Sequence, residues 1–157
     1  RGIVVTHGTD TLEETAYLLA RTLEPTIPVV LTGAMRTSEE EEWDGRRNLV
    51  DSARVAGASE SRGRGTMVVL HGTVLSGLEA LKTDAGEVDT FRAPRGAPLG
   101  VVAGGSVRFT AGGRRSVRRA TLKPAQGPPA RARPGRRAAQ RPVRPEATAG
   151  RIASRAA

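Results

Sequence analysis

Residues 1–109 predict a partial doubly wound α/β domain, with a mostly parallel sheet and helices on both faces, of the Rossmann or flavodoxin-like kind. Three observations predict this class. Short β-branched runs alternate with amphipathic segments along the chain, polar residues follow the first run where a helix is expected to begin, and the composition changes near residue 110. We expect residues 110–157 to form a disordered tail.

The first strand is expected at residues 3–6, a β-branched run of the kind that parallel sheets bury. A helix should follow, because Thr11 and Glu14 have the spacing of a capping box. Pro25 should end this helix, since proline cannot continue one. The apolar stripe by which the helix would pack consists of Leu12, Ala16, Leu19 and Leu23.

The same alternation continues along the chain. The expected elements are a strand at 29–32, a solvated acidic loop at 39–42, a helix beginning at Asp44-Gly45, a strand at 67–70 and a hairpin turn at Gly104-Gly105. The apolar stripe of the second helix is predicted at Leu49, Ala53 and Ala56. Strands that alternate with helices imply right-handed crossovers and parallel pairing.

The net charge of +9 is an average over two different segments. Residues 1–109 contain 12 basic and 15 acidic side chains, a net charge of −3, whereas residues 110–157 contain 13 basic and one acidic side chain, a net charge of +12. The basic segment has no aromatic residue and no apolar period, so it cannot offset an ordering cost of about 1–2 kcal/mol per residue. We interpret it as the product of a shifted reading frame, with a basic nucleic-acid-binding arm as the rival hypothesis.

Several absences exclude classes of protein. The chain has no cysteine, which excludes disulfides and thiolate metal sites. No apolar run approaches the roughly 20 residues that cross a bilayer, so no membrane partner is expected. The chain begins at Arg1 without an initiator Met and enters a strand at once, so we expect that the true start lies upstream.

The polar residues after the first strand are the candidate site. In open parallel sheets ligands bind beyond the carboxyl ends of the strands, which is where Thr9 and Asp10 fall. A Thr hydroxyl needs a neighbouring group to take its proton before it can act as a nucleophile. From local sequence alone these residues are more often helix caps. His7 and His71 lack metal-ligand spacing and are interpreted as structural or incidental.

Residues 3–16 resemble the second signature of the asparaginase/glutaminase family. The resemblance continues in register through residues 28–36 and covers residues 1–109. The other matching motifs are Asp44-Gly45 with Asn48-Leu49, Thr73-Val74-Leu75, Lys82-Thr83, Phe91 and Pro98-Leu99-Gly100.

The resemblance implies an amidohydrolase that converts L-asparagine to L-aspartate and ammonia. Thr9 would lie at the amide carbon, Asp10 would contact the substrate α-ammonium group, and Lys82 would tune the proton of the Thr9 hydroxyl. Gly8 would let the backbone pass close to the ligand, and the amide of Ala34 would help to hold the amide oxygen. No metal or organic cofactor is implied.

The chain departs from the family pattern at both ends. The family's other catalytic Thr, in a Thr-Gly-Gly-Thr signature, and the groups that clasp the substrate α-carboxylate would precede Arg1. The basic tail stands where the family continues into a second, smaller domain. Because cooperating catalytic groups lose most activity when one is removed, we expect the chain alone to have little or no asparaginase activity.

Other questions stay open at this point. The small-molecule substrate could be L-asparagine or L-glutamine, and the full-length protein is expected to be a homo-oligomer, usually a tetramer in this family. An asparaginase-like subunit of a tRNA-dependent amidotransferase is the alternative function, and nucleic acid is otherwise expected to bind only through the tail. We expect a cytoplasmic location, with an exported form as the alternative.

Overall fold

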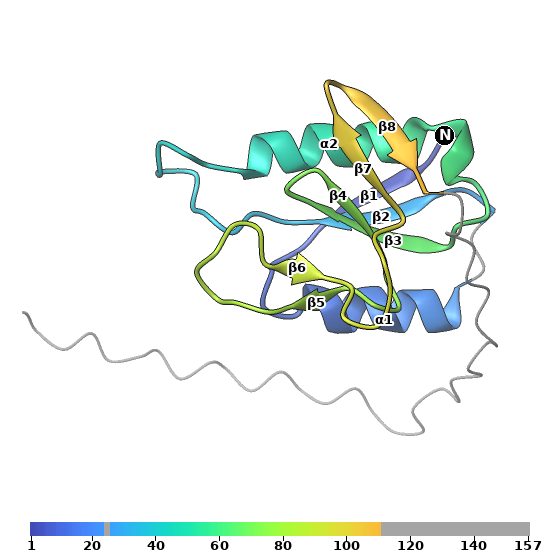
Figure 1. Cartoon of the computed structure of the whole chain (residues 1–157), viewed down its shortest axis with the longest axis horizontal. Coiled ribbons are helices and arrows are strands. Elements are labelled where there is room, and N and C mark those ends of the chain that lie inside the picture. Colours follow the sequence, from blue (N-terminus) through green and yellow to red (C-terminus); the bar gives the residue numbers. More distant parts are fainter. Residues whose placement is uncertain (24–25, 111–157) are drawn as a thin grey trace, which may run out of the picture. The chain divides into compact units, whose positions relative to one another are not determined.

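The computed structural model describes residues 1–23 and 26–110, and Figure 1 shows a sheet with a helix on either side. Residues 111–157, which make up nearly all of the predicted tail, lie outside the described residues, as does Pro25. The described elements are β1 (Ile3–Thr6), α1 (Leu12–Thr22), β2 (Val29–Thr32), α2 (Gly45–Gly57), the 3-10 helix η1 (Ser59–Ser61), β3 (Thr66–Leu70), β4 (Thr73–Ser76), β5 (Leu81–Lys82), β6 (Phe91–Arg92), β7 (Gly100–Ala103) and β8 (Ser106–Phe109). None of the helices in this part of the chain is long and apolar enough to cross a membrane.

The main sheet of the described residues is mixed, with the strand order β1-β2-β3-β4-β7-β8. The β1–β2 and β2–β3 pairs are parallel, as the alternating pattern predicted. The remaining pairs are antiparallel, which makes this half of the sheet different from the mostly parallel sheet that was expected. The predicted hairpin is confirmed between β7 and β8, where Gly104 and Gly105 both have positive φ, as a type I′ turn requires.

The two helices cover opposite faces of the sheet (Figure 1). Because side chains alternate along a strand, β2 and β3 contribute to both faces. One core cluster joins Leu12 and Ala16 of α1 to strand residues that include Val29, Leu31, Val68 and Leu70. The other joins Val55 and Ala56 of α2 to strand residues that include Val30, Met67, Val69 and Val74. The expectation of helices on both faces is therefore confirmed.

The predicted stripe of α1 is correct over most of its length. Leu12 and Ala16 are fully buried, and Leu19 packs against the same cluster. Leu23 is 44% exposed, because it lies beyond the helix with an extended backbone and so leaves the helical face. The capping-box prediction is wrong: Thr11 is the N-cap, but its side chain makes no capping hydrogen bond.

The predicted stripe of α2 is mostly wrong. Leu49 and Ala53 are exposed, and Ala56 alone of the predicted set is buried. The face that packs on the sheet contains Asn48, Asp51, Ser52, Val55 and Ala56. Polar groups can be buried there because they are hydrogen-bonded.

Asn48 is the centre of this polar contact. Its Nδ2 donates to the carbonyl of Gly33 at 3.0 Å and to Oδ2 of Asp44 at 2.8 Å, and its Oδ1 accepts the N–H of His71 at 2.9 Å. The fully buried amide thus joins the start of α2 to the segments that follow β2 and β3. The inward face of α2 therefore combines hydrogen-bonded polar groups with the buried apolar side chains of Val55 and Ala56.

Gly33 provides a test of how closely the ends of β1 and β2 approach. A Cβ atom at Gly33 would lie 2.5 Å from the carbonyl oxygen of His7, whereas one at Gly57 would meet nothing within 4 Å. We expect Gly33→Ala to destabilise the protein by about 1–3 kcal/mol through this backbone clash. Gly57→Ala, the matched control, should be stabilising by about 0.4–1 kcal/mol. Urea unfolding of both variants measures the difference, and equal stabilities would contradict the contact.

Candidate active site

His7 holds the loop after β1 at the carboxyl end of the sheet. The backbone N–H of His7 donates to the carbonyl of Thr32 at 2.8 Å, and this bond extends the β1–β2 pairing by one residue. Its Nδ1 donates to the carbonyl of Gly8 at 2.8 Å, so Nε2 of the neutral ring accepts from the Thr15 hydroxyl at 3.0 Å. These contacts tie the loop to α1, so His7 has a structural role, one of the two alternatives that the sequence left open.

Lys82 reaches this loop from a distant part of the chain. Its Nζ donates to Oγ1 of Thr9 at 3.1 Å and to Oδ1 of Asp10 at 2.9 Å. The Lys82 side chain is only 15% exposed, whereas that of Asp10 is 95% exposed. The structure therefore brings together the three residues that the sequence singled out as catalytic.

The ion pair affects the charge state of the site. The hydrogen bond and the positive charge of Lys82 lower the pKa of the Asp10 carboxyl group from its ordinary value. Asp10 is therefore an anion at neutral pH. As an ammonium group, Lys82 can stabilise negative charge on Oγ1 of Thr9, but it can accept the proton of Thr9 only after losing one of its own.

Glu13 is a member of the site that the sequence did not single out. Its carboxylate, in the first turn of α1, accepts the backbone N–H of Lys82. An acidic side chain in the first turn of a helix also interacts favourably with the helix dipole. No local signal identifies its partner, because Lys82 lies 69 residues further along the chain.

Gly8 precedes Thr9 in the same loop, whereas Ala34 belongs to the neighbouring loop after β2. Gly8 is exposed, and a Cβ atom there would meet no protein atom within 4 Å, so the space beside it is open. Ala34 follows Gly33, whose Cβ position would be 3.0 Å from Cγ2 of Thr9. The next two N–H groups, of Met35 and Arg36, donate to Asp44. The N–H of Ala34 makes no hydrogen bond within residues 1–23 and 26–110.

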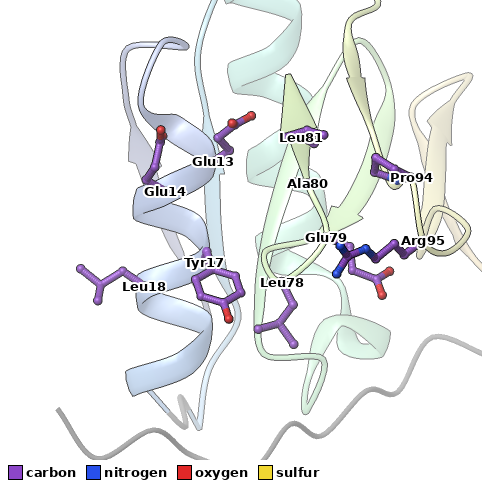
Figure 2. Close-up of a pocket in the computed structure, with 10 residues that line it drawn as sticks. All are labelled: Glu13, Glu14, Tyr17, Leu18, Leu78, Glu79, Ala80, Leu81, Pro94 and Arg95. Carbon is purple, nitrogen blue, oxygen red and sulfur yellow. The ribbon is translucent and has the colours of Figure 1, made fainter. Parts of the chain in front are cut away.

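A hollow of about 310 Å³ lies beside the charged groups. Its lining consists of Asp10, Glu13, Lys82, Thr83, Asp84 and Ala85. A larger hollow of about 670 Å³ lies between α1 and the segments around residues 78–81 and 94–95 (Figure 2). This larger hollow is lined mainly by apolar side chains, and of the three residues Asp10, Glu13 and Lys82 it contacts only Glu13. The smaller hollow, which contacts all three, is therefore the candidate site. In the part of the chain that is described, no cluster of His, Asp and Glu could hold a metal ion.

Known proteins resemble the chain over the same region. Residues 1–114 match the family model described as Asparaginase, N-terminal. L-asparaginase 2 of Bacillus subtilis is 47% identical over 102 residues, which are 65% of this chain and 27% of that protein. A probable periplasmic L-asparaginase of Haemophilus influenzae is 43% identical over 108 residues, which are 69% of this chain and 31% of that protein.

A solved structure agrees with these matches. The crystal structure of a probable cytoplasmic L-asparaginase from Campylobacter jejuni superposes with a TM-score of 0.68 and 41% identity, covering 69% of this chain and 35% of that one. The chain thus spans about a third or less of the length of these relatives. Because the family model covers most of its length, the chain belongs to the asparaginase family, matching its N-terminal domain.

Proposed function

We propose that the chain carries part of the catalytic centre of an L-asparaginase, which hydrolyses L-asparagine to L-aspartate and ammonia. The observation that carries the proposal is the contact of Lys82 Nζ with both Thr9 and Asp10. A hydroxyl group held against a mostly buried amine is a pairing that can activate a Thr side chain for amide hydrolysis. The names of the related proteins support the same reaction.

In this proposal each residue acts on a different part of the substrate. Thr9 lies at the side-chain amide carbon, where its hydroxyl either attacks or orients the attacking water. Lys82 controls the proton of that hydroxyl and stabilises charge on its oxygen. The C–N bond breaks, water supplies a hydroxyl group to the carbon and a proton to the leaving nitrogen, and ammonia departs.

Binding of the amino-acid part of the substrate is assigned to the open side of the site. Asp10 is anionic and 95% exposed, so it can pair with the substrate α-ammonium group. Gly8 leaves room for the ligand, and the N–H of Ala34, which has no hydrogen-bond partner in the described residues, is assigned to the amide oxygen. L-Glutamine, which is one methylene longer, is the competing substrate, because such a difference changes binding by only about 1–3 kcal/mol.

Four broader features belong to the same proposal: self-assembly, the fold, the location and the form of the substrate. The intact protein assembles with copies of itself, which would cover the exposed apolar side chains Tyr17 and Leu18 of α1 and Leu49 and Val50 of α2. In the intact protein the sheet belongs to a doubly wound fold, of which residues 1–109 of this chain form a partial N-terminal α/β domain. The intact protein resides in the cytoplasm, as the name of the Campylobacter jejuni relative indicates for that protein, although another relative is named as periplasmic.

The relatives named as asparaginases favour free asparagine as the substrate over a role as a subunit of a tRNA-dependent amidotransferase.

The charge pairing in the site predicts a change in the titration of Asp10. We expect Lys82→Met to raise the pKa of the Asp10 carboxyl group to its ordinary value, because both causes of the lowering come from Lys82. A carboxyl group whose pKa is lowered in the folded state stabilises that state above its unfolded pKa, and this contribution is lost as the pH falls through the folded value. The stability difference between wild type and variant should therefore shrink below about pH 4. NMR titration of the Asp10 carboxyl carbon measures the shift, and an unchanged pKa would contradict the ion pair.

Catalysis can be tested in a chimera that supplies the rest of an enzyme. Residues 1–109 of this chain replace the matching segment of L-asparaginase 2 from Bacillus subtilis, and ammonia release is measured with L-asparagine and L-glutamine. We expect turnover of L-asparagine in the common enzymatic range of about 1–10³ s⁻¹. In the chimera, Thr9→Val and Lys82→Met should each lower kcat by about 10²-fold or more, because each removes a reacting or proton-handling group.

The 157-residue chain by itself serves as the comparison and is expected to release little ammonia. Thr22→Val in the chimera is the control for loss of a hydroxyl group, since the Thr22 hydroxyl only donates to the carbonyl of Leu18 within α1. A folded chimera that hydrolyses neither amino acid would overturn the proposed function. Full activity in the Thr9→Val chimera would remove Thr9 from the mechanism.

A further inference from the structure

β5, which carries Lys82, lies outside the main sheet. It is two residues long and pairs within the described residues with β6 alone, where Leu81 is opposite Arg92 and Lys82 is opposite Phe91. The N–H of Thr83 also donates to this side, to the carbonyl of Thr90 at 3.0 Å. The ladder of the main sheet therefore does not fix how far Lys82 stands from the loop of Thr9 and Asp10.

Glu13 connects the two segments. Its carboxylate accepts the backbone N–H of Lys82, at a partly buried position. Glu13 also lies four residues after Thr9, in the first turn of the helix whose start the Thr9 loop forms. Figure 2 shows the Glu13 side chain extending from α1 toward the segment of Leu81, while that of Glu14 does not turn toward it. One carboxylate thus joins the helix that begins at the site to the strand that supplies the amine.

We propose that Glu13 is a positioning residue, which sets the distance of Lys82 from Thr9 and Asp10 by holding the backbone amide of Lys82. The inference rests on the proposed function for the importance of that distance, but the contact itself belongs to this chain. A lysine side chain is long and flexible, so its amine is placed accurately only if its own backbone is held. Glu13 supplies this hold from the same rigid element that positions Thr9.

A role of Glu13 as a hydrogen-bond acceptor and a role as a negative charge predict opposite effects for two variants of this residue. If Glu13 acts by holding the amide, a glutamine can replace it, since its carbonyl oxygen also accepts a hydrogen bond, whereas an aspartate one methylene shorter cannot reach. If Glu13 acts only as a negative charge near Lys82 and Asp10, the aspartate would substitute and the glutamine would not. Asp84 is a further carboxylate beside the same hollow, and it is unchanged in both variants.

The test uses the full 157-residue chain and two NMR measurements, hydrogen exchange of the Lys82 amide and titration of the Asp10 carboxyl group. In Glu13→Asp we expect amide exchange to be about tenfold faster or more, because a charge-assisted hydrogen bond is lost. The pKa of Asp10 should rise toward its ordinary value, because Lys82 moves away from it. Glu13→Gln should keep the slow exchange and the low pKa of Asp10.

Glu14→Gln is the matched control, since it removes an identical charge from the same turn of α1 at an exposed position. It should leave both measurements at their wild-type values. The proposal is overturned if Glu13→Asp changes neither measurement, if it changes amide exchange but not the pKa of Asp10, or if Glu13→Gln disturbs the site as much as Glu13→Asp. None of these measurements depends on turnover, so an inactive chimera would refute the proposed function without deciding the role of Glu13.

Discussion

Parallel pairing of β1 on β2, with Thr6 opposite Thr32, is the constraint on which the rest of the site depends. It brings the carboxyl ends of the two strands to one edge of the sheet, so that the loop after Thr6 runs beside Gly33. The absence of a side chain at Gly33 permits this approach, because a Cβ atom would clash with the carbonyl of His7. The Thr9 hydroxyl and the amide of Ala34 then come from adjacent loops and share one small region.

Buried polar groups hold these loops in place on the side of α2. Asp44 accepts the N–H groups of Met35 and Arg36, and Asn48 binds the carbonyl of Gly33 and the N–H of His71. Each of these backbone groups would otherwise be costly to bury without a partner. The start of α2 therefore holds the loop after β2 in place. Leu49 and Val50, on the outer face of α2, take no part in this contact and are exposed.

The site combines a mostly buried cation with an exposed anion. Lys82 is largely shielded from water, whereas its partner Asp10 is exposed, so solvent screens the ion pair from the side of Asp10. Asp10 remains open to solvent and so keeps lone pairs for a ligand. One ion pair thus holds the Thr9 hydroxyl group and leaves the Asp10 carboxylate exposed, which is the arrangement that the proposed function uses.

The sequence by itself predicted the parallel pairing of the first strands, the position of α1 and the hairpin, because β-branched runs, apolar periods and turn glycines are local patterns. The resemblance to a family marked Thr9, Asp10 and Lys82 as candidate site residues, and the fold brings these three side chains together. Only the tertiary structure decided that Leu49 and Ala53 face outward while Asn48 is buried, since two of the hydrogen-bond partners of the Asn48 side chain lie 15 and 23 residues away in the chain. It likewise decided the antiparallel half of the sheet and the contact of Glu13 with Lys82. A local sequence pattern indicates how a segment can pack. A buried polar group, however, is stable only where another segment supplies its hydrogen-bond partner, and distant segments come into contact only in the folded chain.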